Sequence, residues 1–155
     1  MKACFCGGIL SAVWKGPGAD LPQDGHVVLC VDDEVVGLQV RKMILERSGY
    51  TVLTAHDGPS GLTIFNDKAI DAVVLDYAMP GMHGGEVAAK MRESKPEVPI
   101  LLLSAYMGLP AEVTRLVDVY MTKGEGAPML LQKLNSLFQN QIVGDGADRA
   151  NPVSV

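Results

Sequence analysis

Basic residues, cysteines and long apolar segments are all scarce in this chain, and each scarcity excludes a class of protein. The 155 residues include 13 Lys and Arg against 18 Asp and Glu, which gives a formal net charge of -5, and the basic residues do not cluster. An acidic chain without a basic patch offers no electrostatic attraction to nucleic acid or to an anionic membrane. We therefore expect no nucleic-acid partner and no membrane partner.

The cysteine content argues against a disulfide-stabilised secreted protein. Only Cys4, Cys6 and Cys30 occur, and Cys30 lies inside an apolar run, where it is best explained as a small core residue. An odd number with one buried member predicts a reducing compartment, the cytoplasm. The apolar stretch from Ala3 to Trp14 is too short to span a bilayer and is interrupted by glycine and serine.

What the chain does have is a regular alternation of apolar runs with helical patterns. Strands that are apolar on both faces and separated by helices predict a parallel sheet that is covered on both sides. Five such units predict an α/β, flavodoxin-like, doubly wound fold with a five-stranded parallel sheet in the order 2-1-3-4-5. The predicted strands are His26–Val31, Thr51–Ala55, Ala72–Asp76, Ile100–Leu103 and Val119–Met121.

Helices are predicted between these strands from apolar spacing and end signals. In the first, Val36, Val40, Met43, Ile44 and Arg47 share one face, which we expect to point inward, and Ser48-Gly49 ends it. The others are a helix capped by Asp57 with Pro59 in its first turn, a helix from Gly84 to Ser94, a shortened fourth helix opened by Pro110, and a last helix that begins at Pro128.

The same patterns divide the chain into three parts. Residues 26–139 form the predicted domain, and 155 residues with 48% hydrophobic content suit one such core. Residues 1–25 and 140–155 lack matching periodicity and contain several glycines and prolines. We therefore expect a flexible N-terminal extension and a flexible C-terminal tail.

Carboxylates follow two of the predicted strands. Asp76 ends the run Ala72-Val73-Val74-Leu75, and Asp32 and Asp33 follow the first strand. Ser104 follows the fourth strand and Lys123 the fifth. Because ligands of open α/β sheets bind outside the carboxyl ends of the strands, we expect these five residues to share one site.

The residue types at this edge indicate metal-assisted phosphoryl chemistry. Three carboxylates repel one another unless they bind a cation, and ligands that are all oxygen favour Mg²⁺ over Zn²⁺. A central Asp beside Mg²⁺ can act as a nucleophile and form an acyl phosphate. Lys123 can balance the phosphoryl oxygens while Ser104 donates a hydrogen bond to them.

The chain resembles the response-regulator receiver family from about His26 to Phe138. The resemblance is carried by Val31-Asp32-Asp33-Glu34, Leu75-Asp76-Tyr77-Ala78-Met79-Pro80-Gly81, Leu103-Ser104-Ala105 and Tyr120-Met121-Thr122-Lys123. It implies that Asp76 is the phosphoacceptor, and that Asp32, Asp33, Asp76 and the backbone carbonyl of Ala78 bind Mg²⁺. It also implies that Ser104 and Lys123 contact the phosphoryl group, and that Ser104 and Tyr120 form the switch.

The resemblance also implies a role. We expect a stand-alone regulator that takes its phosphoryl group from a histidine kinase or a phosphotransfer protein and then binds an unknown downstream protein or passes the group on. Such a protein is a phosphoacceptor that assists its own phosphorylation and dephosphorylation rather than an enzyme. In the family, the positions of Ala78 and Tyr106 tune attack by water, and a small residue with an aromatic ring at these two positions predicts slow self-dephosphorylation.

The sequence departs from the family at two places. Gly124 stands where the family usually has a proline after the lysine, and the segment between Ser104 and Lys123 is a few residues short. Two other functions therefore stay open. One is a degenerate receiver that binds partners without phosphorylation, and the other, with less support, is an Mg²⁺-dependent aspartyl phosphohydrolase.

Overall fold

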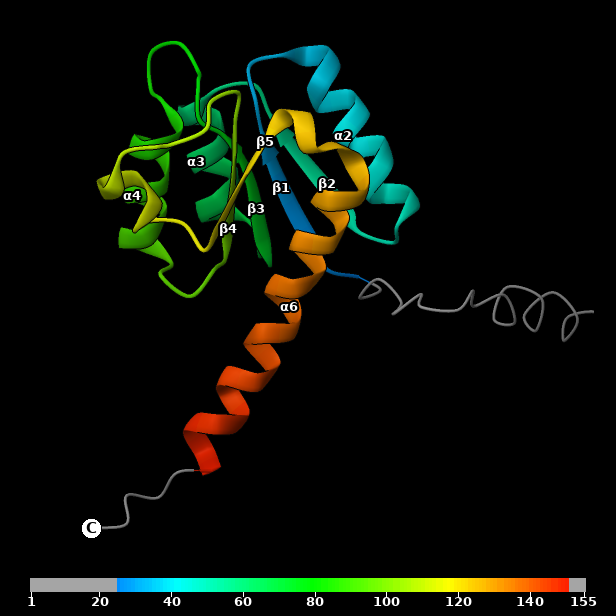
Figure 1. The fold of residues 1–155 in the computed structure, drawn as a ribbon, viewed down its shortest axis with the longest axis vertical. Coiled ribbons are helices and arrows are strands. Elements are labelled where there is room, and N and C mark those ends of the chain that lie inside the picture. Colours follow the sequence, from blue (N-terminus) through cyan, green and yellow to red (C-terminus); the bar gives the residue numbers. More distant parts are fainter. Residues whose placement is uncertain (1–24, 151–155) are drawn as a thin grey trace, which may run out of the picture.

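The computed structural model describes residues 25–150, with side chains described as far as residue 141. Figure 1 shows a sheet flanked by helices, with one long helix that extends past the end of the sheet. In chain order the elements are β1 (Val27–Val31), α2 (Val35–Arg47), β2 (Thr51–Ala55), α3 (Gly58–Asp67), β3 (Ala72–Asp76), α4 (Gly84–Ser94), β4 (Ile100–Ser104), α5 (Ala111–Thr114), β5 (Val119–Thr122), the 3-10 turn η1 (Lys123–Glu125) and α6 (Gly126–Ala150).

The five strands form one parallel sheet in the order β2-β1-β3-β4-β5, which confirms the predicted fold class and strand order. Three strands carry apolar residues on both faces, and all three lie in the interior of the sheet: β1, β3 and β4. β5 has only one neighbour and is correspondingly half-exposed. A strand that is apolar on both faces in the sequence is therefore an interior strand of the sheet.

Alternate residues of the strands face two separate cores. Val28, Cys30, Val74 and other residues on one face pack against α2 and α6. Their immediate neighbours, such as Leu29 and Val73, face the other core, which is covered by α3, α4 and α5. Side chains of a strand point alternately to opposite faces, so each buried strand serves both layers.

Several local features match the predicted end signals. The Asp57 carboxylate accepts a hydrogen bond from the Ser60 amide at 2.7 Å and so caps α3. This bond lowers the pKa of Asp57. Gly49 has a φ of 95°, a conformation that glycine adopts without steric cost after the end of α2.

The predicted inward face of α2 is wrong. Val36, Val40 and Met43 are exposed, at 71%, 45% and 47%, whereas Leu38 and Leu45 are fully buried. The two leucines lie seven residues apart, two helical turns, and so share a face. Arg41 lies between them on this face, and the predicted face had more apolar members than this stripe of two leucines and an arginine.

The last helix differs from prediction at both ends. A capping box in which Thr122 and Glu125 exchange hydrogen bonds starts η1, and α6 begins at Gly126 rather than Pro128. The helix then continues to Ala150, so the boundary predicted at residue 139 lies inside it. Gly144 and Gly146 each disfavour a helix by only about 1 kcal/mol, and the next proline is Pro152. Of the two predicted extensions, residues 1–24 and 151–155 lie outside the described part of the chain.

The short fourth helix is confirmed, since α5 spans four residues.

Arg92 of α4 binds the segment that follows this helix. Its guanidinium donates to the carbonyls of Leu116 and Val98, at 2.7 and 2.8 Å, and also pairs with the Asp118 carboxylate. Asp118 in turn accepts from the Ile100 amide at 2.8 Å, which ties the start of β4 to the approach to β5.

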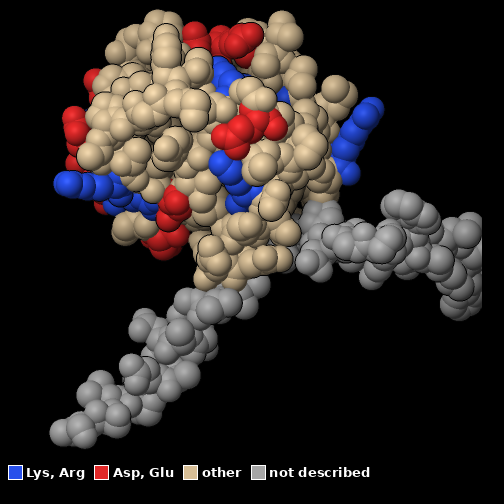
Figure 2. Space-filling view, viewed as in Figure 1, with Lys and Arg blue, Asp and Glu red and all other residues tan. Residues whose placement is uncertain are grey.

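The surface carries both signs of charge. On the face drawn in Figure 2, Lys and Arg are interspersed with Asp and Glu, and no basic field is visible there. Within residues 25–150, no helix is both long and apolar enough to cross a membrane.

Candidate functional site

Three carboxylates meet at the carboxyl edge of the sheet. Asp32 and Asp33 follow β1, Asp76 ends β3, and one oxygen of each lies within 4.8 Å of the others. Asp32 and Asp76 are buried, and Asp33 is exposed. β1 and β3 are adjacent in the sheet, and this pairing brings together acids that are more than forty residues apart in sequence. The predicted acidic cluster is therefore present.

Burial, and next the negative charge of Asp32, raise the pKa of Asp76 to about 6. Lys123 and the backbone amide of Ala78 act in the opposite direction by stabilising the charged form. Among the described residues, Asp76 Oδ1 is one of two buried side-chain oxygens that accept no well-aligned hydrogen bond. A buried acceptor without a donor is costly, so this oxygen is ready to bind a cation or a proton.

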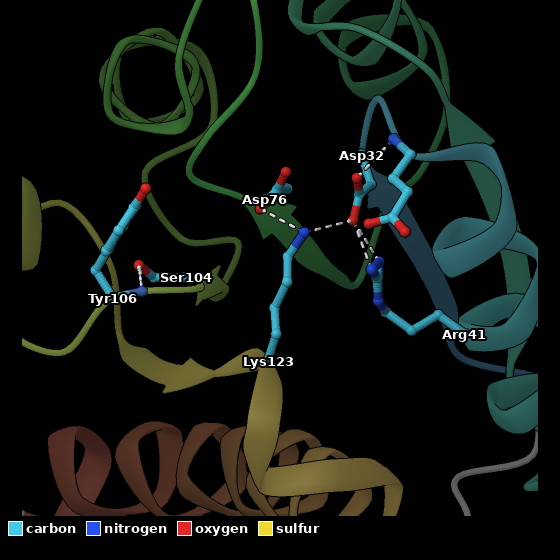
Figure 3. A network of polar contacts seen from close by, with 7 residues as sticks. Asp32, Arg41, Asp76, Ser104, Tyr106 and Lys123 are labelled. Carbon is cyan, nitrogen blue, oxygen red and sulfur yellow. Dashed lines mark hydrogen bonds and ion pairs between the residues drawn. The ribbon is translucent and has the colours of Figure 1, made fainter.

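Lys123 links the two buried acids. Its Nζ lies 3.1 Å from Asp76 Oδ1 and 3.4 Å from Asp32 Oδ2. Figure 3 shows the Lys123 ammonium between the two acids. Burial alone would lower the pKa of Lys123, but the hydrogen bond and charge of Asp76 and the charge of Asp32 raise it overall. The ammonium group therefore carries its charge at neutral pH. The prediction from the strand end places this side chain correctly, and no cis peptide occurs in residues 25–150.

Arg41 is a member of the site that the sequence analysis missed. Its guanidinium donates from Nη1 to Asp32 Oδ2 at 2.9 Å and from Nη2 to the same oxygen at 2.5 Å. The side chain is 12% exposed, and it reaches the acid from the buried face of α2. The available signal was its position between Leu38 and Leu45. Asp32 Oδ1 accepts from the Glu34 amide at 2.8 Å, so both oxygens of Asp32 have partners.

The donor set fits Mg²⁺. Three carboxylates face two cations, which leaves one negative charge without compensation. Oxygen ligands from one or two carboxylates, completed by water and phosphate oxygens, are what Mg²⁺ prefers. Asp76 Oδ1, paired with Lys123 alone, and the exposed Asp33 retain lone pairs for the ion, whereas Asp32 Oδ2 holds both Arg41 and Lys123.

Ser104 ends β4 and is fully buried. Its hydroxyl oxygen accepts a hydrogen bond from the Tyr106 amide at 2.9 Å, which leaves the hydroxyl proton available for another acceptor. In Figure 3, Ser104 lies on the opposite side of Asp76 from Asp32. The side chain of Tyr106 is exposed.

The two remaining predicted residues lie at the margin of the site. Ala78 is exposed in the turn after β3, where its amide contacts the Asp76 carboxylate. Tyr120 is 42% exposed on β5, and its carbonyl accepts from Lys133 Nζ at 3.2 Å.

Cys30 is fully buried, and burial raises the pKa of its thiol to about 12, which confirms it as a core residue rather than a reactive thiol.

Comparisons with known proteins agree with this geometry. The family model of the response regulator receiver domain matches residues 28–135. The chain is 36% identical over 115 residues to the transcriptional regulatory protein TrcR of Mycobacterium tuberculosis, a match that covers 72% of this chain and 45% of TrcR. The chain spans about half the length of the curated relatives it matches.

A solved structure with the same fold contains bound ligands. The response regulator TrrA of Thermotoga maritima, in complex with Mg²⁺ and BeF, aligns with a TM-score of 0.69 and 34% identity over 72% of this chain and 98% of TrrA. TrrA has also been solved with the histidine kinase ThkA, and that structure aligns with a TM-score of 0.68 and 34% identity over 72% of this chain and 97% of TrrA.

Proposed function

Because this chain belongs to the response-regulator receiver domain family, we propose that it accepts a phosphoryl group on the carboxylate of Asp76. The observation that carries the proposal is the state of this side chain. It is buried at the end of a central strand, has one oxygen without a well-aligned donor, and lies 3.1 Å from an ammonium group. No other described carboxylate combines these three properties.

In the proposed transfer, an oxygen of Asp76 forms a bond to phosphorus while the bond between phosphorus and the nitrogen of a phosphohistidine breaks. The electron pair of that bond stays with the imidazole, and the product is an acyl phosphate. The raised pKa of Asp76 makes it a better nucleophile than an ordinary carboxylate, once a cation holds it ionised. Mg²⁺, held by Asp32, Asp33, Asp76 and the Ala78 carbonyl, would supply that charge and neutralise phosphoryl oxygens.

The other two residues of the proposed set act on the phosphoryl oxygens. The Lys123 ammonium already contacts two acids. It can therefore exchange its contact with Asp76 for one with a phosphoryl oxygen without leaving the site. The free proton of the Ser104 hydroxyl can be donated to a phosphoryl oxygen. Tyr120, half-exposed on the edge strand, is proposed as the residue that responds to that movement.

A histidine kinase, or a phosphotransfer protein, is the proposed donor, and the TrrA complex with the kinase ThkA supports this choice. Receiver domains are phosphoacceptors rather than enzymes with turnover. Slow self-dephosphorylation belongs to the proposal, with Ala78 and Tyr106 as its tuning residues. Three expectations stay predictions: a stand-alone role, no nucleic-acid partner, and a cytoplasmic location.

The test is incubation of the protein with Mg²⁺ and acetyl phosphate, followed by intact mass measurement. The expected result is a labile adduct of one phosphoryl group, absent from Asp76→Asn and retained in Asp67→Asn, a matched change at an exposed acid of α3. An adduct that persists in Asp76→Asn would place the acceptor elsewhere. An adduct that decays within seconds would contradict the slow loss that we expect.

One observation favours the degenerate receiver as a second candidate. The guanidinium of Arg41 already occupies Asp32, an acid that the family uses for the metal. If neither acetyl phosphate nor a competent kinase adds mass to the wild-type protein, this candidate replaces the first.

A further inference from the structure

The ion pair between Arg41 and Asp32 is the one feature of the site that phosphoryl transfer does not require. Both guanidinium nitrogens donate to a single carboxylate oxygen that is fully buried. Hydrogen bonds between ionised partners are roughly twice as strong as those between neutral ones. The pair therefore holds Asp32 in competition with any metal ion.

The chain gives this arginine room in the site. A Cβ on Gly37 would lie 3.2 Å from Arg41 Nη2 and 3.7 Å from the carboxyl carbon of Glu34. Any larger residue at position 37 would therefore crowd the guanidinium. The aliphatic part of Arg41 lies on the buried stripe of α2 with Leu38 and Leu45, which directs the charged end toward the sheet edge.

A second location for the guanidinium lies next to the first. A groove of about 330 Å³ opens between α2 and the start of α6. Arg41, Lys123 and Glu34 line it together with apolar residues, and Glu34 supplies the one carboxylate among those lining residues. Arg41 can therefore leave Asp32 without entering an apolar environment unpaired.

We propose that Arg41 is a built-in counter-cation that competes with Mg²⁺ for Asp32 and thereby sets the affinity of the site for the metal. In the metal-free protein it compensates one of the three clustered charges. A divalent ion that enters finds Asp32 neutralised and must displace the guanidinium toward Glu34. Arg41 is thus a positioning residue, and this inference rests on the proposed metal-dependent function.

The test is calorimetric titration of the full chain with MgCl₂ alone, without a phosphodonor. Arg41→Met keeps the aliphatic part and Arg41→Gln keeps a polar end, and both are expected to bind Mg²⁺ about tenfold more tightly than the wild type. Arg47→Gln removes the same charge from an exposed position on the same helix and is the matched control, with unchanged affinity expected. Thermal unfolding of each variant reports whether it is folded.

A second measurement uses the unmodified protein. The side-chain NMR signals of the Arg41 guanidinium are followed during the Mg²⁺ titration, and they are expected to shift with the same midpoint as the calorimetric binding. This arm keeps the inference testable even if both Arg41 variants fail to fold.

The outcomes separate the two proposals. Unchanged or weaker Mg²⁺ binding in folded Arg41 variants, with normal binding by the wild type, overturns the competition and leaves the phosphoacceptor role intact. Arg41 signals that stay fixed through metal saturation also overturn it. Failure of all the proteins to bind Mg²⁺ overturns both proposals, because the site is then not a metal site.

Discussion

Replacement of Asp76 by asparagine is expected to stabilise the metal-free protein. The folded state holds an ionised Asp76 in a buried position beside Asp32, and this raises its pKa from 3.8 to about 6. A shift of about two pKa units corresponds to roughly 3 kcal/mol, at 1.36 kcal/mol for each unit. Asparagine has nearly the same shape without the charge, but it weakens the contact with Lys123. We therefore expect a net gain of about 1 to 3 kcal/mol at pH 7.5.

The sign of the pH dependence follows from proton binding. Between about pH 4 and pH 6 the folded protein binds more protons at Asp76 than the unfolded chain does, so the stability from this group falls as pH rises. It is fully present below pH 3.8 and is lost above about pH 6. The variant lacks this dependence. The difference in unfolding free energy between the two proteins should therefore be largest above pH 6 and should close near pH 4.

The assay is urea denaturation in EDTA at a series of pH values. A gain of about 2 kcal/mol moves the midpoint by roughly 1 M urea for a protein of this size. Asp67→Asn, at an exposed position, is expected to leave the midpoint unchanged. Added Mg²⁺ should remove most of the advantage of Asp76→Asn, because the ion compensates the charge. The reasoning is refuted if Asp76→Asn is less stable than the wild type at pH 7.5, or if the gain does not vary with pH.

Three further changes test other parts of the structure. Arg92→Met removes the donors to three backbone carbonyls and the pair with Asp118, and should lower the unfolding free energy by about 1 to 3 kcal/mol; a loss below about 0.5 kcal/mol would show that these contacts are not needed. Gly84→Ala places a Cβ 2.5 Å from the Asp76 carbonyl oxygen, so the turn after β3 must shift, and calorimetry should show weaker Mg²⁺ binding together with a lower melting temperature. A chain that ends after Gln141 keeps Phe138, the last buried core residue among the side chains that the structure describes, and should match the full chain within about 0.5 kcal/mol in denaturation; a larger loss would assign packing to the end of α6.

The sheet and its acidic edge could be predicted because both depend on local patterns. A run such as Ala72 to Asp76 is apolar on both faces, which only an interior strand of a covered sheet satisfies, and its bounds agree with β3. Once the strands are parallel, their carboxyl ends must share an edge. Asp32, Asp33, Asp76 and Lys123 then come together by topology alone.

The errors arose where side-chain contacts or modest propensity costs, rather than apolar spacing, decide the structure. The buried face of α2 is the stripe of Leu38 and Leu45, and the contact of Arg41 with Asp32 on that stripe joins residues that apolar spacing does not relate. The start of α6 is set by the reciprocal bonds of Thr122 and Glu125, which form one turn before the expected proline. Its far end depends on the modest helix cost of Gly144 and Gly146, which weaken a helix without ending it.

The contact of Lys123 with both buried acids connects the edge of the sheet to its centre. Its backbone follows β5, which is hydrogen-bonded only to β4, but its ammonium reaches past that neighbour to acids at the ends of β3 and β1. One side chain, through two ion pairs, therefore links the end of the outermost strand to the centre of the sheet. Any event that changes the charge at Asp76 changes the strength of these ion pairs. We expect the end of β5 and the turn η1, which contains Lys123, to respond to such a change.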